Sequence, residues 1–296
     1  MSKLKITGVV APPVVPFTVG GDIDEKKLRQ YINWLIEKGV NALFSLGSFG
    51  GGPLLSIEER KRVAELNVEA VDGRIPVICQ IGHNSTCFSV ELAKHAEKAG
   101  LNAIAVLPPG YYKHTTENIK RYFQEILNSV DIPVYLYNNP GSIGYSIAPE
   151  LLAELAEMGL SGIKDSSFDL VYFQKAMNAV DKEDFNWING TAPLMYPSIM
   201  LGADACVLGP ANAFPELAIS IWNAIQARDY KEAEKLQKKM VKLCGVMNLT
   251  TDVVGVHEMI KLRGFDFGGY PRRPLLPCDE KISTKIKQEL EKLELI

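Results

Sequence analysis

The sequence predicts an α/β protein built as a (β/α)8 TIM barrel with additional C-terminal helices. Three observations support this prediction: a helix-to-strand junction that recurs along the chain, apolar segments of strand length, and helical periodicity between them at roughly thirty residues per unit. The chain has 296 residues, of which 47% are hydrophobic and 23% charged, so it can bury one large core.

The recurring junction consists of a helix end, a Gly, one apolar residue, a small polar residue, Ala or Gly, and a short apolar run. Its copies are EKGVNALFSLG (37–47), EKAGLNAIAVLPP (97–109), EMGLSGIKDSS (157–167) and MLGADACVLGP (200–210). The Gly suits the left-handed position that ends a helix, and the unalternated run is typical of a parallel strand covered on both faces. Further strands are predicted at 9–17, 75–82, 132–138 and 185–190, which makes eight.

Helices are predicted between these strands from periodicity and start signals. The segment that begins at Ser56 carries Glu59 three residues on, which is a capping box. After the eighth strand the pattern becomes wholly helical, so we predict a barrel over residues 1–225 and a helical extension packed on it over residues 226–296. The alternative, a doubly wound open sheet, lacks its G-x-G-x-x-G phosphate fingerprint after the first strand.

Charge and cysteine content narrow the setting. The formal net charge is -3, and Lys and Arg are scattered along the chain, so neither nucleic acid nor a membrane is expected as a partner. The odd number of cysteines and the lack of a C-x-x-C spacing predict reduced thiols and a cytoplasmic protein. The four histidines lack metal-ligand spacing, so no metal and no cofactor are predicted.

Lys164 lies in the middle of the sixth predicted strand, in the segment SGIKDSS (161–167). Strand alternation places it on the opposite face from Ile163 and Asp165, pointing into the barrel, and catalytic groups of such barrels cluster at the strand C-terminal ends. Burial lowers the pKa of an amine and populates its neutral form, which can attack a ketone to form an imine. The alternative is a lysine paired with a barrel carboxylate.

Tyr137 ends the adjacent predicted strand, in the motif YNNP (137–140). Imine chemistry moves protons when the carbinolamine loses water and when the product leaves, so a phenol at this position suits a proton shuttle. The alternative is that Tyr137 only packs in the barrel.

Four motifs stand at matching barrel positions and in matching order: GSFGG (47–51), PPGYYK (108–113), YNNP (137–140) and GIKDSS (162–167). Together they resemble the dihydrodipicolinate synthase and N-acetylneuraminate lyase family, the pyruvate-dependent class I aldolases. The resemblance covers most of the chain. It implies that Lys164 forms a Schiff base with pyruvate and that Tyr137 relays protons.

The resemblance also assigns substrate-binding residues. The loop of Gly47, Ser48 and Phe49 corresponds to the family's site for the pyruvate carboxylate, and Val207 corresponds to the position beside the pyruvate on the eighth strand. In the family, the residue at the position of Tyr111 completes the proton relay and reaches the site of a neighbouring subunit. A small-molecule substrate and a homotetramer are therefore expected.

Departures from the family pattern bear on the substrate. Phe49 replaces a hydroxyl residue of the usual relay, and Ser142 stands where lysine-biosynthetic synthases carry an arginine that clamps the aldehyde's carboxylate. Ala192 and Pro193 replace the Asp-Glu pair of sialic acid lyases. We therefore expect a Schiff-base lyase acting on a 2-keto-3-deoxy or 4-hydroxy-2-oxo acid, with a more apolar acceptor end. The alternatives are a 4-hydroxy-tetrahydrodipicolinate synthase, a sugar-acid dehydratase that uses the same imine, and a non-catalytic 2-oxo acid sensor.

Overall fold

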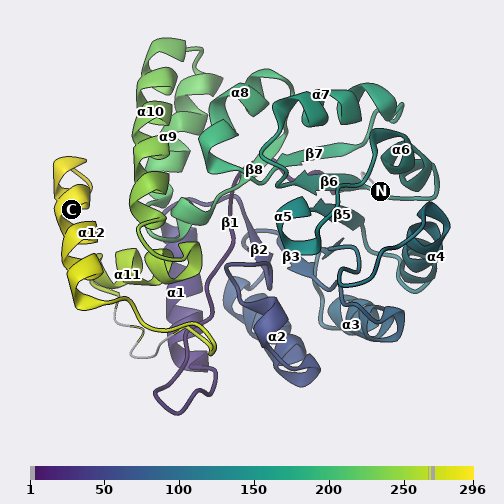
Figure 1. Ribbon diagram of the computed structural model, residues 1–296, viewed down its shortest axis with the longest axis horizontal. Helices are drawn as coiled ribbons and strands as arrows, with labels where there is room; N and C mark the ends of the chain where they lie inside the picture. Colours follow the sequence, from purple (N-terminus) through teal and green to yellow (C-terminus); the bar gives the residue numbers. More distant parts are fainter. Residues whose placement is uncertain (1–3, 266, 268–270) are drawn as a thin grey trace.

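The computed structural model describes residues 4–265, 267 and 271–296. Within these residues, eight parallel strands form a closed barrel in chain order, with β8 paired to β1 (Figure 1). The strands are β1 (Gly8–Ala11), β2 (Ala42–Ser45), β3 (Val77–Gln80), β4 (Ala103–Val106), β5 (Val134–Asn138), β6 (Gly162–Asp165), β7 (Asn186–Asn189) and β8 (Ala205–Val207). The predicted (β/α)8 barrel is confirmed.

Helices connect successive strands and continue beyond the last one (Figure 1). The α-helices are α1 (Glu25–Glu37), α2 (Ile57–Val71), α3 (Thr86–Lys98), α4 (Thr116–Leu127), α5 (Pro140–Ile143), α6 (Pro149–Glu157), α7 (Leu170–Ala179), α8 (Met195–Met200), α9 (Pro215–Gln226), α10 (Tyr230–Met247), α11 (Asp252–Leu262) and α12 (Glu280–Lys292). Short 3-10 turns are η1 (Gly52–Leu54), η2 (Ala192–Leu194) and η3 (Gly209–Asn212). No helix of the described residues is long and apolar enough to cross a membrane.

Two local predictions can be compared directly with these elements. The capping box at the start of α2 is present, because Ser56 Oγ accepts from the Glu59 N–H at 3.2 Å and Glu59 Oε2 accepts from the Ser56 N–H at 2.9 Å. The first strand was expected to run to residue 17, which is wrong, since it ends at Ala11. Pro12 and Pro13 follow and have no N–H to donate to a strand ladder.

Buried side chains separate into an inner and an outer layer. The inner cluster fills the barrel and includes Val10, Ala42, Phe44, Ile78, Ala105, Tyr135, Tyr137, Ile188 and Val207. The outer cluster lies between the strands and the helices and contains Ile163. Alternation along β6 therefore turns Ile163 outward and Lys164 inward, as predicted.

The C-terminal helices are anchored at the end of the barrel where the strands terminate. In Figure 1, α10 runs beside α9, and α11 and α12 lie on the same side of the barrel. Gln237 of α10 donates to the carbonyls of Ala192 and Pro193 at 3.1 and 3.0 Å and accepts from the Tyr196 N–H at 3.0 Å. These bonds tie the middle of α10 to the loop after β7, at the C-terminal end of the barrel strands.

Candidate active site

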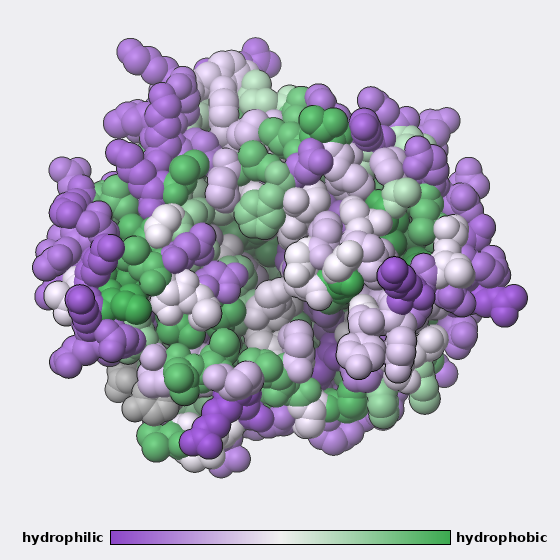
Figure 2. All heavy atoms as spheres, viewed as in Figure 1, coloured by the Kyte–Doolittle hydropathy of each residue, from purple (hydrophilic) through white to green (hydrophobic). Residues whose placement is uncertain are grey.

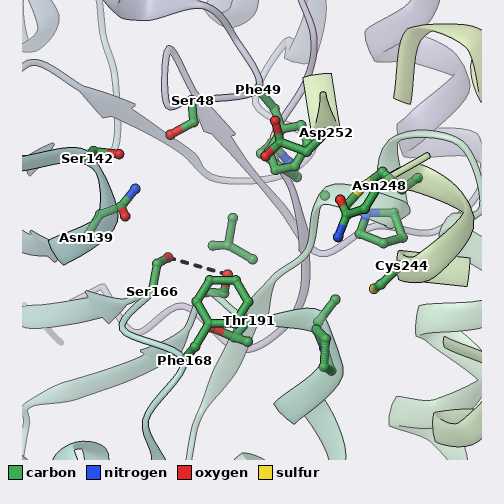
Figure 3. Close-up of a pocket in the computed structure, with 18 of the residues that line it drawn as sticks. Ser48, Phe49, Asn139, Ser142, Ser166, Phe168, Thr191, Cys244, Asn248 and Asp252 are labelled. Carbon is green, nitrogen blue, oxygen red and sulfur yellow. Dashed lines mark hydrogen bonds between the residues drawn. The ribbon is translucent and has the colours of Figure 1, made fainter. Parts of the chain in front are cut away.

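A cavity of about 550 Å³ lies at the C-terminal ends of the strands and is also bounded by the C-terminal helices. This volume is in the usual range of small-molecule sites. Figure 2 shows strongly hydrophilic side chains gathered at the periphery of the visible face and less polar ones toward its middle. The residues that line the cavity include Ser48, Phe49, Tyr137, Asn139, Ser142, Lys164, Ser166, Gly190, Thr191, Val207, Asn248 and Asp252 (Figure 3).

Lys164 is 5% exposed and projects between two aromatic rings. Its Nζ lies 3.8 Å from the centroid of the Phe44 ring and 3.9 Å from that of Tyr137. No carboxylate of the described residues lies within ion-pair distance of the amine, so the alternative of a lysine paired with a barrel carboxylate finds no support in that part of the chain. Burial lowers the pKa of Lys164, although the Tyr137 phenol partly opposes this. The neutral, nucleophilic form of this amine is therefore more populated than the neutral form of an exposed lysine.

Tyr137 lies directly opposite Lys164 in the register of β5 and β6. Its hydroxyl accepts from Asn139 Nδ2 at 3.0 Å and lies 3.4 Å from Ser48 Oγ. Burial raises the pKa of the phenol, but Lys164, Ser48 and Asn139 together outweigh this effect and bring the pKa below its ordinary value. The phenol is therefore a better proton donor than a free tyrosine, and it lies next to the amine.

A polar contact on the outer face of the barrel joins β5 and β6. Asn138 and Asp165 are the outward-facing neighbours of Tyr137 and Lys164, and they too are opposite each other in the register. Asn138 Nδ2 donates to Asp165 Oδ1 at 2.7 Å, and Ser167 Oγ donates to Oδ2 at 2.7 Å. Burial raises the pKa of Asp165 to about 6. The contact holds β5 and β6 together where the amine and the phenol meet.

The loop after β2 is tightly wound below the cavity opening. Leu46 and Gly51 adopt positive φ angles of 58° and 65°, and the Gly51 N–H donates to the Ser48 carbonyl at 3.1 Å. Within the described residues, no backbone carbonyl or side chain accepts from the N–H groups of Ser48 and Phe49. Consecutive free N–H groups of this kind form a concavity that suits an anion. Ser48 and Phe49 line the cavity, whereas Gly47 does not.

Two glycines are required by close packing at the cavity. A Cβ on Gly190 would clash with Ser166 Oγ and would lie 3.1 Å from Lys164 Cε. A Cβ on Gly209 would collide with the ring of Phe49. Gly190 thus leaves the space that Lys164 needs, and Gly209 leaves room for the Phe49 ring.

The residues predicted from the sequence do not all meet in one chain. Lys164, Tyr137, Ser48, Phe49 and Val207 line the cavity. Tyr111 does not: its side chain is 89% exposed, its φ is 64°, and its ring packs edge-on against Tyr112 at 5.0 Å between centroids. A role for Tyr111 in catalysis would depend on a neighbouring subunit.

Several lining residues were missed in the sequence. Asn139 lies within the YNNP motif and Gly190 ends a predicted strand, so both had a local signal that was not used. Asn248 and Asp252 belong to the C-terminal helices, and no sequence pattern showed that these helices reach the cavity. The prediction of an apolar acceptor end is therefore incomplete, because Asn248 and Asp252 add polar groups to the side of the cavity formed by the C-terminal segment. Within the described residues, no group of three or more His, Cys, Asp or Glu side chains is arranged to hold a metal.

The fold and the site define a class of protein: a (β/α)8-barrel enzyme with an amine and a phenol buried side by side at the catalytic end of its barrel. Comparison with known proteins identifies the family. The model of the Dihydrodipicolinate synthetase family matches residues 5–293, so the chain belongs to this family. The resemblance read from four motifs is confirmed.

Individual relatives agree with this assignment. The "Probable 2-dehydro-3-deoxy-D-pentonate aldolase YjhH" of Escherichia coli (strain K12) is 32% identical to this chain over 287 residues, 95% of each protein. A 4-hydroxy-tetrahydrodipicolinate synthase of Bradyrhizobium diazoefficiens is 30% identical and covers 100% of this chain and 99% of its own length. YagE of E. coli K12, a member of the dihydrodipicolinic acid synthase family solved in complex with pyruvate, has a TM-score of 0.94 at 30% identity and covers 98% of this chain and 99% of its own. The chain is therefore a lyase of the class I aldolase type.

Proposed function

We propose that this enzyme cleaves or forms a C–C bond next to the carbonyl of pyruvate, acting on a 2-keto-3-deoxy or 4-hydroxy-2-oxo acid through an imine on Lys164. The observation that carries the proposal is the buried amine with a lowered pKa and no carboxylate partner among the described residues, beside the Tyr137 phenol. Two relatives support the substrate class: YjhH is named as an aldolase of a 2-dehydro-3-deoxy acid, and YagE was solved with pyruvate.

The proposed reaction uses these two groups in turn. Lys164 Nζ attacks the ketone carbon of the substrate, and loss of water from the carbinolamine gives a protonated imine. Tyr137 gives its proton to the departing hydroxyl of the carbinolamine and is left as a phenolate. This phenolate then takes the proton of the C4 hydroxyl, the C3–C4 bond breaks, and its electron pair moves to the imine to form an enamine. The aldehyde leaves, the enamine is protonated at C3, and water releases pyruvate. The phenol that received the C4 proton supplies protons on the return path.

We assign the carboxylate of the 2-oxo acid to the loop after β2. The free N–H groups of Ser48 and Phe49 support an anion-binding role for this loop. The Ser48 hydroxyl lies 3.4 Å from the Tyr137 hydroxyl. A carboxylate held at this loop would place the adjacent ketone carbon between the loop and Lys164. Gly47 contributes by its lack of a side chain, because a Cβ there would lie 2.9 Å from the Phe44 ring. Val207 lines the cavity and, following the family resemblance, is assigned to the position beside the pyruvate.

The proposal extends to assembly and location. Tyr111 and Tyr112 are 89% and 71% exposed, and a strained tyrosine at a loop tip suits contact with a second subunit. We place Tyr111 in the proton relay of a neighbouring site in a homotetramer, following the family resemblance. The five cysteines are all free thiols, which supports the cytoplasm as the location.

A substrate panel tests the reaction class. Lys164 is the sole basic residue among the described residues that line the cavity, and Ser142 is another lining residue. The family resemblance places Ser142 at the position of the arginine with which lysine-biosynthetic synthases clamp a second carboxylate. We expect pyruvate release from a 2-keto-3-deoxy sugar acid with kcat/KM above ~10^4 M⁻¹s⁻¹, and a value at least about tenfold lower for condensation of pyruvate with aspartate semialdehyde. The reverse order would identify a 4-hydroxy-tetrahydrodipicolinate synthase, and a 2-oxo product with an intact carbon chain would identify a dehydratase.

Gly190→Ala tests the space around the amine. The new methyl group would lie against Ser166 Oγ, 2.9 Å from the Asp165 carbonyl oxygen and 3.1 Å from Lys164 Cε. We expect borohydride trapping of the pyruvate imine to slow by roughly tenfold or more, and the free energy of unfolding to fall by about 1–3 kcal/mol. Gly245→Ala is the matched control, because no neighbouring atom of the described residues lies within 4 Å of a Cβ there. Equal trapping rates in the two variants would show that Gly190 does not shape the site.

A further inference from the structure

We infer that the acceptor half of the cavity binds an uncharged, hydroxylated tail, with Thr191 as its hydrogen-bonding residue and Asp252 as a charge filter against anionic tails. This inference rests on the proposed function, because it concerns the partner that leaves or joins pyruvate at the same site. Nothing in the carboxylate-binding loop or at Lys164 requires these two residues, which lie in the loop after β7 and at the start of α11.

Thr191 carries a buried hydroxyl that has no partner among the described residues. The residue is 2% exposed and lines the cavity, and its Oγ1 makes no hydrogen bond within the part of the chain that the structure describes. A buried hydroxyl without a partner is costly, so it is typical of a group that a ligand satisfies. Figure 3 shows Thr191 beside Phe168, on the side of the cavity that Ser166 also lines.

The backbone around Thr191 is fixed in advance. Asn189 Nδ2 donates to the Thr191 carbonyl at 2.9 Å, and Asn189 Oδ1 accepts from the Thr191 N–H at 3.1 Å. The next two carbonyls accept from Gln237 of α10. Because the loop is already ordered, the Thr191 hydroxyl can bind a ligand without a further loss of conformational entropy. This preorganisation allows the site to discriminate between substrates with and without a hydroxyl.

Charge in the cavity is distributed unevenly. Among the described residues that line the cavity, Lys164 is the one basic residue and Asp252 is the one acidic residue. Asp252 lies on the side of the cavity opposite Asn139 and Ser142 (Figure 3). One Asp252 oxygen accepts from the Val253 N–H at 2.8 Å, and no cation of the described residues forms an ion pair with the carboxylate. An unneutralised carboxylate repels a phosphate or a second carboxylate, whereas it can accept hydrogen bonds from a diol.

The substrate chemistry follows from these two features. The carboxylate of the 2-oxo acid is held at the loop of Ser48 and Phe49, and the far end of the substrate meets Thr191, Asn248 and Asp252. These groups offer hydroxyl, amide and carboxylate partners, and none offers a positive charge. The preferred acceptor is a short uncharged hydroxyaldehyde, and its phosphorylated form is disfavoured.

The hydroxyl is tested with Thr191→Val and Thr191→Ser in condensations of pyruvate with glyceraldehyde and with propanal, which lacks hydroxyls. We expect Val to lower the glyceraldehyde-to-propanal ratio of kcat/KM by roughly tenfold, because Val has the shape of Thr without its hydrogen bond, and Ser to restore most of the ratio. Thr284→Val, on the exposed face of α12, is the matched control. A ratio that stays within twofold in Val, or falls equally in Val and Ser, overturns the role of Thr191.

The charge filter is tested with Asp252→Asn and Asp252→Lys, comparing glyceraldehyde 3-phosphate with glyceraldehyde. We expect the preference for the phosphorylated aldehyde to rise about three- to tenfold in Asn and further in Lys, and the difference from wild type to shrink as salt increases. Asp181→Asn, in the α7–β7 loop at the opposite end of the barrel, is the control. An unchanged preference in both variants overturns the filter. Borohydride trapping with pyruvate alone reports separately on Lys164, so loss of imine formation in the wild type would mark a failure of the proposed function instead.

Discussion

Replacing Lys164 by methionine is expected to abolish imine formation and turnover while the barrel stays folded. Methionine has nearly the length of lysine and suits the space between the Phe44 and Tyr137 rings, but it offers no amine. Incubation of the wild type with pyruvate and borohydride should give one covalent adduct per chain in the intact mass, and Lys164→Met should give none. Lys175→Ala, an exposed lysine of α7, serves as the control and should label like the wild type.

The same substitution should change how stability depends on pH. The folded-state pKa of Lys164 is lowered by burial, so between that value and the unfolded value of ~10.4 the unfolded chain binds more protons than the folded one. Stability of the wild type therefore rises with pH across this window. We expect Lys164→Met to be more stable than the wild type near neutral pH, by about 1–4 kcal/mol, and the difference to shrink as pH approaches 10. An adduct on Lys164→Met, or a wild type without one, would remove the basis of the proposed chemistry.

The barrel was predictable because its sequence signals are local. Each junction such as EKAGLNAIAVLPP combines a Gly that ends a helix with an apolar run covered on both faces, and both signals act within about ten residues. Alternation within β6 was sufficient to point Lys164 inward, and register then placed it opposite Tyr137. The first strand was predicted too long because its apolar run continues past Pro12 and Pro13, and these prolines have no N–H to donate to a strand ladder.

The acceptor side of the site depends on contacts between distant segments. Gln237 positions the loop that carries Thr191, across more than forty residues, and Asn248 and Asp252 reach the cavity because α10 ends there. Periodicity identifies a helix and its apolar face, but it does not show where the helix lies relative to a barrel built earlier in the chain. The division of the chain at residue 225 and the subunit contact of Tyr111 stay predictions for the same reason.

The phenol of Tyr137 should matter to the chemistry far more than to the fold. Tyr137→Phe keeps the ring, whose centroid lies 5.4 Å from that of Phe44, and removes only the hydroxyl that accepts from Asn139 and lies near Ser48. Loss of a positioned acid–base group costs roughly 10²–10⁴-fold in rate. We therefore expect kcat to fall at least about 100-fold with a small change in KM, because the phenol acts on the proton that moves in the transition state.

Tyr135→Phe provides the matched control for Tyr137→Phe. Tyr135 lies two residues earlier on the same strand and the same inner face, and its hydroxyl donates to Asn186 Oδ1 at 3.0 Å, toward the end of the barrel remote from the cavity. Both substitutions remove one buried phenolic hydroxyl and should cost a similar free energy of unfolding, roughly 0.5–1.5 kcal/mol. They should differ in turnover, since Tyr135 is not among the described residues that line the cavity and is paired with Gly162, whereas Tyr137 is paired with Lys164.

Borohydride trapping should also slow in Tyr137→Phe alone, because the carbinolamine must gain a proton to lose water. Equal turnover in the two variants would make Tyr137 a packing residue and would assign the proton transfer to another group, with Ser48 or water as the nearest candidates.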